Sequence, residues 1–145
     1  MIRPATPGDL SRVAEILVFV KRTKFYPIFR NDAWYFGELQ VLSVAKEYEA
    51  LLDGIWVYDD GVVKGLIRVE GDEIVELYVD AFFQNQGIGG ALLEHAKRNF
   101  PVTWLWALEK NVDALRFYRA HGFVPSGVRK LEEDTPETLV KLIRA

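Results

Sequence analysis

The chain has 145 residues, of which 50% are hydrophobic and 27% charged, and this predicts one globular domain over residues 1–145. A net charge of −3 and an isoelectric point near 5.4 disfavour a nucleic-acid partner, because such partners bind broad basic faces. The lack of cysteine excludes disulfides and thiolate chemistry, and two widely separated histidines disfavour a metal site. With no apolar leader and no run near the roughly 18 residues of a membrane span, we expect a cytoplasmic protein without a membrane partner.

The first half of the chain predicts one strand, two helices and three further strands. A short strand at 2–3 precedes a helix over 7–22, with Thr6 as its N-cap and Pro7 at its first position. A second helix is expected from 31 or 32 to about 52, where Gly37 weakens or splits it. Alternating apolar runs separated by turn signals then predict strands at 55–59, 62–70 and 73–79.

The second half predicts a glycine-rich turn, two helices and three strands. The turn at 84–90 leads into a helix that Pro101 ends, and a strand follows at 102–108. Asn111 caps a helix that runs to His121, after which strands are expected at 123–129 and 138–144. This order, β-αα-βββ-α-β-α-ββ, predicts an α/β fold with a mixed central sheet and helices on both faces.

The strongest chemical signal is Gln84-x-x-Gly87-x-Gly89 between a strand and a helix. Glycines there expose backbone N–H groups, and the helix N-terminus adds about half a positive charge, which suits a phosphate or pyrophosphate. A Walker loop would need a Lys-Ser/Thr pair that this segment lacks. A Rossmann fingerprint would need a third glycine at another spacing and an acid after the next strand, where Leu108 stands. A tight turn without a ligand is the remaining alternative.

Two segments together resemble one family. Gln84-x-x-Gly87-x-Gly89 resembles the acetyl-CoA pyrophosphate motif of the GNAT superfamily of N-acetyltransferases. Asn111-x-x-Ala114-x-x-Phe117-Tyr118-x-x-x-Gly122-Phe123 is similar to that family's second signature. The resemblance implies a single-domain GNAT-like fold, acetyl-CoA as co-substrate, no metal and an amine acceptor.

The resemblance also implies how the chain would hold its co-substrate. Backbone amides of the turn would bind the pyrophosphate, the end of the preceding strand would pair with the pantetheine, and Asn111 would bond to the cofactor arm. Asn85 stands where the family often has glycine, and asparagine tolerates a left-handed backbone. The cofactor-binding residues implied are Leu77, Tyr78, Val79, Gln84, Asn85, Gln86, Gly87, Ile88, Gly89, Gly90, Asn111 and Phe117.

Acetyl transfer to an amine needs a neutral amine and a proton for the departing thiolate. The resemblance implies Tyr118 as the acid, because its hydroxyl would lie near the thioester sulfur; a core tyrosine is the alternative. Glu73 and Glu76 are the candidate bases, and strand alternation predicts that they face opposite sides of the sheet unless a β-bulge resets the alternation. The alternatives are a solvated Glu73, a Glu76 paired with Arg68, and deprotonation through water.

We therefore expect an acetyl-CoA-dependent N-acetyltransferase in which a primary amine attacks directly within a ternary complex. The acceptor is left open between a small amine such as a polyamine and a protein amine. Aromatic residues at 25–36 would line an acceptor pocket, pack helices onto the sheet or form a homodimer surface. The acidic stretch 132–137 would attract a cationic acceptor or stay solvated. A non-catalytic acyl-CoA-binding sensor on the same fold is the alternative function.

Overall fold

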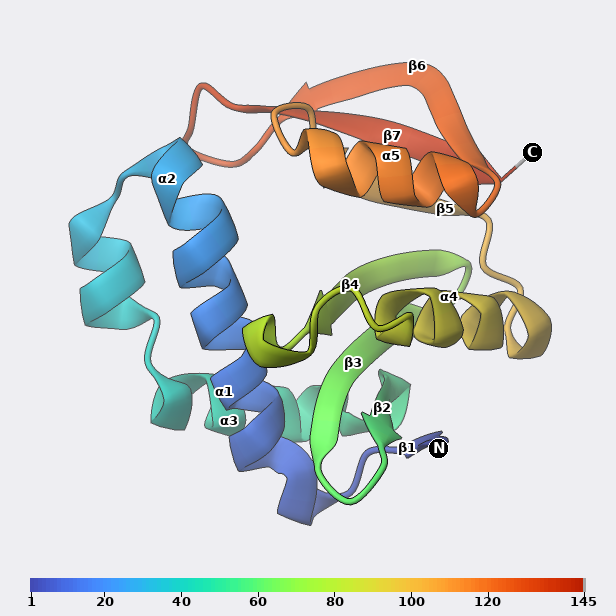
Figure 1. The fold of residues 1–145 in the computed structure, drawn as a ribbon. Coiled ribbons are helices and arrows are strands. Elements are labelled where there is room, and N and C mark those ends of the chain that lie inside the picture. Colours follow the sequence, from blue (N-terminus) through green and yellow to red (C-terminus); the bar gives the residue numbers. More distant parts are fainter. Residues whose placement is uncertain (145) are drawn as a thin grey trace.

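The computed structural model describes residues 1–144, which form one seven-stranded sheet in the order β1-β2-β3-β4-β5-β7-β6. The strands are β1 (Ile2–Pro4), β2 (Ile55–Asp59), β3 (Val63–Glu70), β4 (Glu73–Val79), β5 (Trp104–Leu108), β6 (Phe123–Leu131) and β7 (Thr138–Arg144). Every neighbouring pair is antiparallel except β4 and β5, which run parallel at the centre (Figure 1). The predicted mixed sheet is confirmed.

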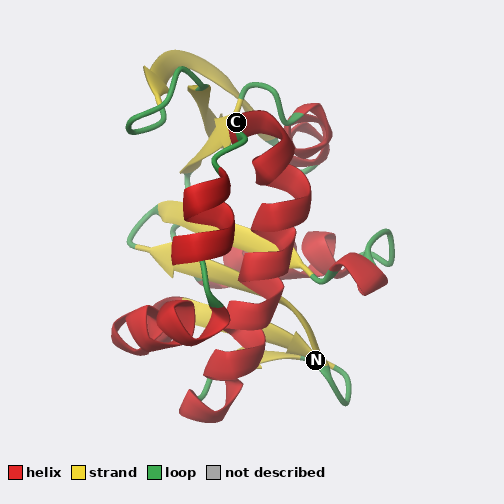
Figure 2. Cartoon of the chain, turned by 90° about the vertical axis from the view of Figure 1, so that its left-hand side faces the viewer, coloured by secondary structure: helices red, strands yellow, loops and turns green. Residues whose placement is uncertain are grey.

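Helices cover both faces of this sheet, as predicted (Figure 2). Helices α1 (Leu10–Val20) and α3 (Val41–Tyr48) pack on one face, and α4 (Ile88–Asn99) packs on the other. The short helix α2 (Tyr26–Phe29) follows α1, and α5 (Val112–Ala120) lies beside β6. Within residues 1–144, every helix is too short or too polar to be a membrane span.

Helix α4 is placed by apolar contacts and by one glycine. Leu92, Leu93 and Ala96 are fully buried against the sheet, the inward face that their spacing predicts. Gly65 on β3 allows the close approach, because a Cβ there would lie 3.1 Å from a methyl group of Ile88 and from a backbone oxygen. The N-terminus of α4 is therefore held directly over the sheet.

The two N-terminal helices differ from their predicted extents. The first begins with a 3₁₀ turn, η1 (Pro7–Asp9), and passes beyond residue 22 through a wider π-helical turn, η2 (Lys21–Phe25), into α2. The second is divided into η3 (Ala33–Glu38), α3 and η4 (Glu49–Gly54), with the break just after Gly37. The Arg22 side chain stabilises the break, since its guanidinium donates to backbone carbonyls released there, those of Tyr35 at 3.1 Å and Leu39 at 3.0 Å.

Strand β4 contains a bulge, the exception allowed for in the alternation of Glu73 and Glu76, at a position that the sequence pattern did not reveal. Arg68 pairs with Glu76, but the next residue, Val69, pairs with Ile74. Val75 is consequently an extra residue without a partner on β3. Such an insertion resets the alternation of side chains along the strand.

The bulge changes where the two candidate bases lie. Glu73 pairs with Glu70, and in this register it shares the sheet face of Glu76, on the side of α1 and α3. The prediction that the two glutamates face opposite sides is wrong. The physical reason is the one-residue insertion, which reverses the facing of every residue before it.

Candidate active site

The site is a cleft between two strands that part. Strands β4 and β5 pair only at Glu73 with Trp104 and Ile74 with Leu105, and they diverge beyond that point (Figure 1). A cleft of about 1580 Å³ opens there, lined by β4, the glycine turn, α5, the α1–α3 segment and the β6–β7 connection. This splay is the feature that opens the cleft.

The glycine turn presents backbone amides to the cleft. Gly87 caps α4 with a φ of 80°, and Asn85 also takes a left-handed φ of 61°. The first helical hydrogen bond runs from the Ala91 N–H to the Gly87 carbonyl at 3.0 Å. The N–H groups of Ile88, Gly89 and Gly90 lie in the first turn of α4, where the helix itself supplies no acceptor. This geometry fits an anion such as a pyrophosphate.

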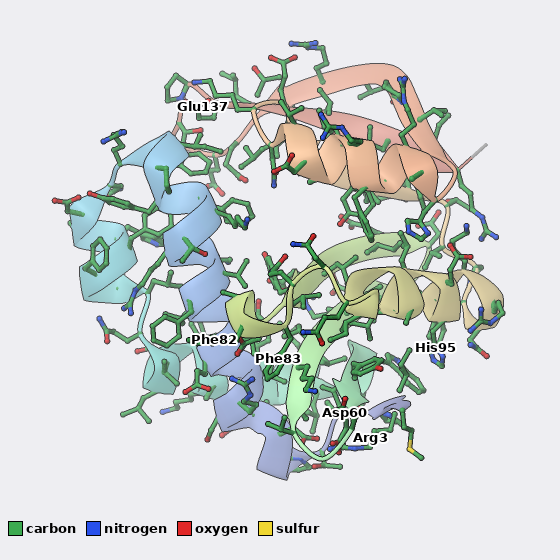
Figure 3. All side chains as sticks on the ribbon, in the orientation of Figure 1. Arg3, Asp60, Phe82, Phe83, His95 and Glu137 are labelled. Carbon is green, nitrogen blue, oxygen red and sulfur yellow. The ribbon has the colours of Figure 1, made fainter. Side chains whose placement is uncertain are left out.

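The end of β4 is tied to this turn by a side chain. Gln84 Nε2 donates to the Val79 carbonyl at 2.8 Å, and the Asp80 carboxylate accepts from the Phe82 N–H at 2.8 Å. Figure 3 shows Phe82 and Phe83 on this connection, and Phe82 is 89% exposed. Gln84 and Asn85 line the cleft, whereas Gln86 is exposed and is not among the lining residues.

Helix α5 closes over the turn from the other half of the sheet. Asn111 Oδ1 accepts from the Ala114 N–H at 3.3 Å, so this side chain caps α5 and also lines the cleft. The Phe117 ring lies against the turn, since a Cβ at Gly89 would be 3.5 Å from it. Tyr118 lines the cleft beside Phe117, and burial raises the pKa of its hydroxyl to about 12.

A second contact joins α5 to α4 and was not predicted. His121 Nδ1 lies 2.8 Å from a Glu94 oxygen, and Lys97 Nζ donates to the His121 carbonyl at 2.8 Å. Hydrogen bonds from His121 and Lys97 hold the pKa of Glu94 below its usual range. The imidazole also lies directly over Gly90, where a Cβ would come within 3.2 Å of the ring. The third glycine of the turn was the sequence signal for this close packing.

Glu76 is engaged in a buried cluster. Its carboxylate accepts from Arg68 Nε at 2.7 Å and from the Tyr48 hydroxyl at 2.6 Å. The side chains of Arg68 and Glu76 are only 11% and 8% exposed. Burial, the Glu76 charge and this hydrogen bond raise the pKa of Tyr48. These contacts match the alternative that Glu76 is the cross-strand partner of Arg68.

Glu73 lies at the narrow end of the cleft, where β4 and β5 still pair. Within residues 1–144 its carboxylate makes no hydrogen bond and no ion pair, and the side chain is half-buried. Burial raises the pKa of Glu73, and the charge of Glu70 raises it further while Lys130 lowers it. An unengaged carboxylate with a raised pKa is suited to accept a proton.

The wall opposite α5 combines aromatic and charged side chains. Trp34 and Tyr35 line the cleft with their rings 4.7 Å apart, so part of the predicted aromatic cluster faces the cleft. The connection between β6 and β7 supplies acidic residues, and Figure 3 shows Glu137 on it, on the side of α2. Glu137 is buried and its carboxylate pairs with Lys110 at 3.0 Å. This wall therefore combines acidic side chains with an edge-to-face aromatic pair.

Comparisons of the sequence with known proteins all match acetyltransferases. Residues 52–125 match a family model described as Acetyltransferase (GNAT) domain. The chain is 26% identical over 125 residues to peptidyl-lysine N-acetyltransferase YiaC of Escherichia coli (strain K12), an alignment that covers 85% of this chain and 82% of YiaC.

Solved structures show the same fold. Apo-form YjaB from Escherichia coli superposes with a TM-score of 0.76 at 19% identity, covering 100% of this chain and 97% of that one. The PaiA N-acetyltransferase of Thermoplasma acidophilum, in complex with coenzyme A, superposes with a TM-score of 0.72 at 18% identity, covering 97% and 96%. At these identities the likeness concerns the fold.

Proposed function

The chain belongs to the GNAT family of acetyltransferases, as its two motifs indicated, and on that premise we propose that it transfers the acetyl group of acetyl-CoA to a primary amine. The amine attacks directly within a ternary complex, so no side chain becomes acetylated on the way. The observation that carries the proposal is the cleft between the diverging strands β4 and β5, with the N-terminus of α4 at its edge. The PaiA structure, whose fold this chain shares, was solved with coenzyme A.

The turn fits the pyrophosphate of the co-substrate. The amides of Ile88, Gly89 and Gly90 bind its oxygens at the positive end of α4. The edge of β4 at Leu77 and Tyr78, free of β5, supplies backbone groups to the pantetheine. The Val79 carbonyl is already engaged by Gln84, so we assign the other β4 groups to that task.

Two side chains handle the protons. The Tyr118 hydroxyl remains protonated at neutral pH, because burial raises its pKa to about 12, and it donates to the departing thiolate. Glu73 accepts the proton of the incoming ammonium group, since it lines the cleft and is not engaged by another residue of the described chain. Glu76 supports the strand through Arg68 and Tyr48 and takes no proton from the acceptor.

The acceptor class that we test first is the lysine side chain of a peptide. The similar Escherichia coli protein YiaC is named a peptidyl-lysine N-acetyltransferase. Lysine also provides a primary amine on a long flexible stem, which can reach the narrow end of a deep cleft. Free polyamines are the comparison class.

Thiol release from acetyl-CoA in the presence of amines tests the proposal. The parent should release thiol in proportion to acetylated product, and its rate should fall at acidic pH as Glu73 becomes protonated. Because the pKa of Glu73 is raised, this acidic limb of the pH–rate profile should lie at higher pH than the usual pKa range of glutamate. Glu73→Gln should flatten that limb, whereas Glu76→Gln, the matched control, should keep it.

The outcomes separate the alternatives. Acetyl-CoA binding without turnover on any amine would favour the sensor function over the enzyme. Turnover with an unchanged acidic limb in Glu73→Gln would assign deprotonation to ordered water. No measurable acetyl-CoA binding would contradict the proposal as a whole.

A further inference from the structure

Lys21 is a cation in the cleft wall that its surroundings leave without a partner. It follows directly after α1, as the first residue of η2, and it lines the cleft beside Val20, Phe25 and Trp34. Within residues 1–144, Lys21 Nζ has no carboxylate within 4.0 Å and makes no hydrogen bond. Its nearest described aromatic contact is with Trp34, whose ring centroid lies 5.8 Å away.

The charges around Lys21 do not compensate for its burial. Burial lowers the pKa of Lys21, and four charged groups act on it from a distance: Glu76, Glu132, Arg68 and Glu47. Glu76 is held by Arg68 at 2.7 Å, so much of its charge is already balanced. The carbonyls at the end of α1 favour a cation at this position but supply no ion pair.

Other basic residues of the same cleft are accounted for. The Lys130 ammonium lies 4.4 Å from the centroid of the Trp106 ring, a close cation–π contact. Lys24, one helical turn after Lys21 on η2, is exposed to water and carries no burial cost. At 5.8 Å, the contact between Lys21 and Trp34 is near the outer limit of such interactions and compensates little.

A half-buried ammonium without a partner reduces stability unless a ligand supplies the opposite charge. Lys21 and Glu73 line the same cleft and carry opposite charges, so an acceptor that spans the cleft can present its amine to Glu73 and an anionic group to Lys21. We propose that Lys21 binds a carboxylate of the acceptor, which makes the acceptor an amine that also bears a carboxylate. The inference rests on the proposed function and narrows its acceptor class.

The carboxylate can come from two sources with the same chemistry. One is a free amino acid, whose own carboxylate is part of the acceptor, and the other is a peptide with an acidic residue next to the modified lysine. Two matched pairs of acceptors separate these sources. L-lysine is paired with 1,5-diaminopentane, which lacks only the carboxylate, and an end-blocked Gly-Lys-Glu-Gly peptide is paired with Gly-Lys-Gln-Gly.

Steady-state rates at saturating acetyl-CoA provide the test. The parent should show a lower KM for the carboxylate-bearing member of at least one pair. Lys21→Met should raise that KM by about tenfold to hundredfold, the effect of losing a charge-assisted hydrogen bond, with kcat within about twofold. The KM of the carboxylate-free member should not change, and Lys21→Arg should restore most of the selectivity.

Lys24→Met is the matched control. It removes the same charge from the same helical turn and from the same cleft, but from an exposed position. We expect its KM values to stay within about twofold of the parent, because exposed charges act weakly on a distant ligand. An equal loss of selectivity in both variants would show a general field effect and would overturn the specific contact.

Further outcomes decide between this inference and the proposed function. If acetyl-CoA binds and amines are acetylated, but the carboxylate makes no difference in the parent or in Lys21→Met, the inference fails and the proposed function stands. If no amine of the panel is acetylated, both fail. We expect Lys21→Met to melt no lower than the parent, and a melting temperature several degrees lower would assign Lys21 to the fold and contradict the inference.

Discussion

The two ends of the cleft are built in different ways. The glycine turn is contiguous in sequence, and its binding groups are backbone amides positioned by left-handed residues such as Asn85 and Gly87. The acceptor wall is assembled from η2, η3, β4 and the β6–β7 connection, and its binding groups are side chains. A backbone site depends on the absence of side chains, whereas a side-chain site depends on charges and on how far each is buried. Substitutions should therefore act through the side chain that they add at one end and through the charge that they remove at the other.

The largest effect is expected where the acceptor wall meets the core. Glu76→Gln leaves the buried Arg68 guanidinium without its buried anionic partner, so we expect the free energy of unfolding to fall by about 3 kcal/mol. Urea unfolding at neutral pH measures this loss. Glu70→Gln is the control, because Glu70 is an exposed partner at 3.4 Å from Arg68 and should cost less than about 1 kcal/mol. Equal stability of Glu76→Gln and the parent would show that the buried pair contributes nothing.

The next largest effect is expected on kcat, at the Tyr118 hydroxyl between the two ends of the cleft. Tyr118→Phe removes the proposed acid, and we expect kcat to fall by about 10²-fold with little change in acetyl-CoA affinity. The control is Tyr35→Phe, which removes a hydroxyl from the opposite wall of the same cleft. Since the pKa of Tyr118 is about 12, the pH–rate profile of the parent should show no loss of activity from deprotonation of Tyr118 below pH 10. An unchanged kcat, where chemistry limits the rate, would return Tyr118 to a packing residue.

The glycine turn should respond to bulk and charge at a single position. Gly89→Glu places a carboxylate where the amides must approach an anion, so acetyl-CoA should bind more than about tenfold more weakly. Gly89→Ala is the control, because its Cβ would lie at ordinary contact distances, 3.5 Å from Phe117 and 3.6 Å from Val79. Calorimetry compares the three proteins. Unchanged binding by Gly89→Glu would remove the turn from the co-substrate site.

The smallest expected effect is a dependence of the protein's stability on pH, and it arises at His95, away from both ends of the cleft. His95 lies on α4 beside Trp56, its Nε2 is buried without a partner among the described residues, and burial lowers its pKa. The unfolded chain then binds a proton near pH 6.5 before the folded chain does, so stability should fall as the pH drops from about 7 to 5. His95→Phe should remove this slope while His121→Asn keeps it, as melting temperatures at both pH values would show. A slope that survives in His95→Phe would place the titrating group elsewhere.

The sequence predicted local features well and long-range ones poorly. Strand β4 was predicted with its observed bounds, and Asn111 was predicted as the cap of α5, because both depend on neighbouring residues alone. A bulge was left open as an alternative, but it could not be located at Val75 because nothing in IVELYV marks an extra residue, and its position is visible only against β3. The partners of Glu76 come from β3 and α3, and only Arg68 was foreseen.

The unpaired state of Lys21 could not be predicted for the same reason. A lysine near the end of a helix is usually solvated, and its surroundings here come from residues distant in sequence that line the same cleft, such as Trp34. Likewise, the splay of β4 from β5 leaves no trace in either strand, since both are ordinary apolar runs. Local composition specifies the elements, and tertiary packing decides which of their charges remain free.

The short hydrogen-bonded ladder between β4 and β5 is also a weak junction between the two halves of the sheet. Only two residue pairs join the half-sheets, but Ile74, Leu92 and Leu105 belong to one apolar cluster that continues across the gap. The two halves of the sheet are thus joined more by hydrophobic contacts than by hydrogen bonds, and hydrophobic contacts weaken on cooling. Amide exchange in the cold should quicken first along the facing edges of β4 and β5, because the two halves of the sheet have the fewest hydrogen bonds between them there.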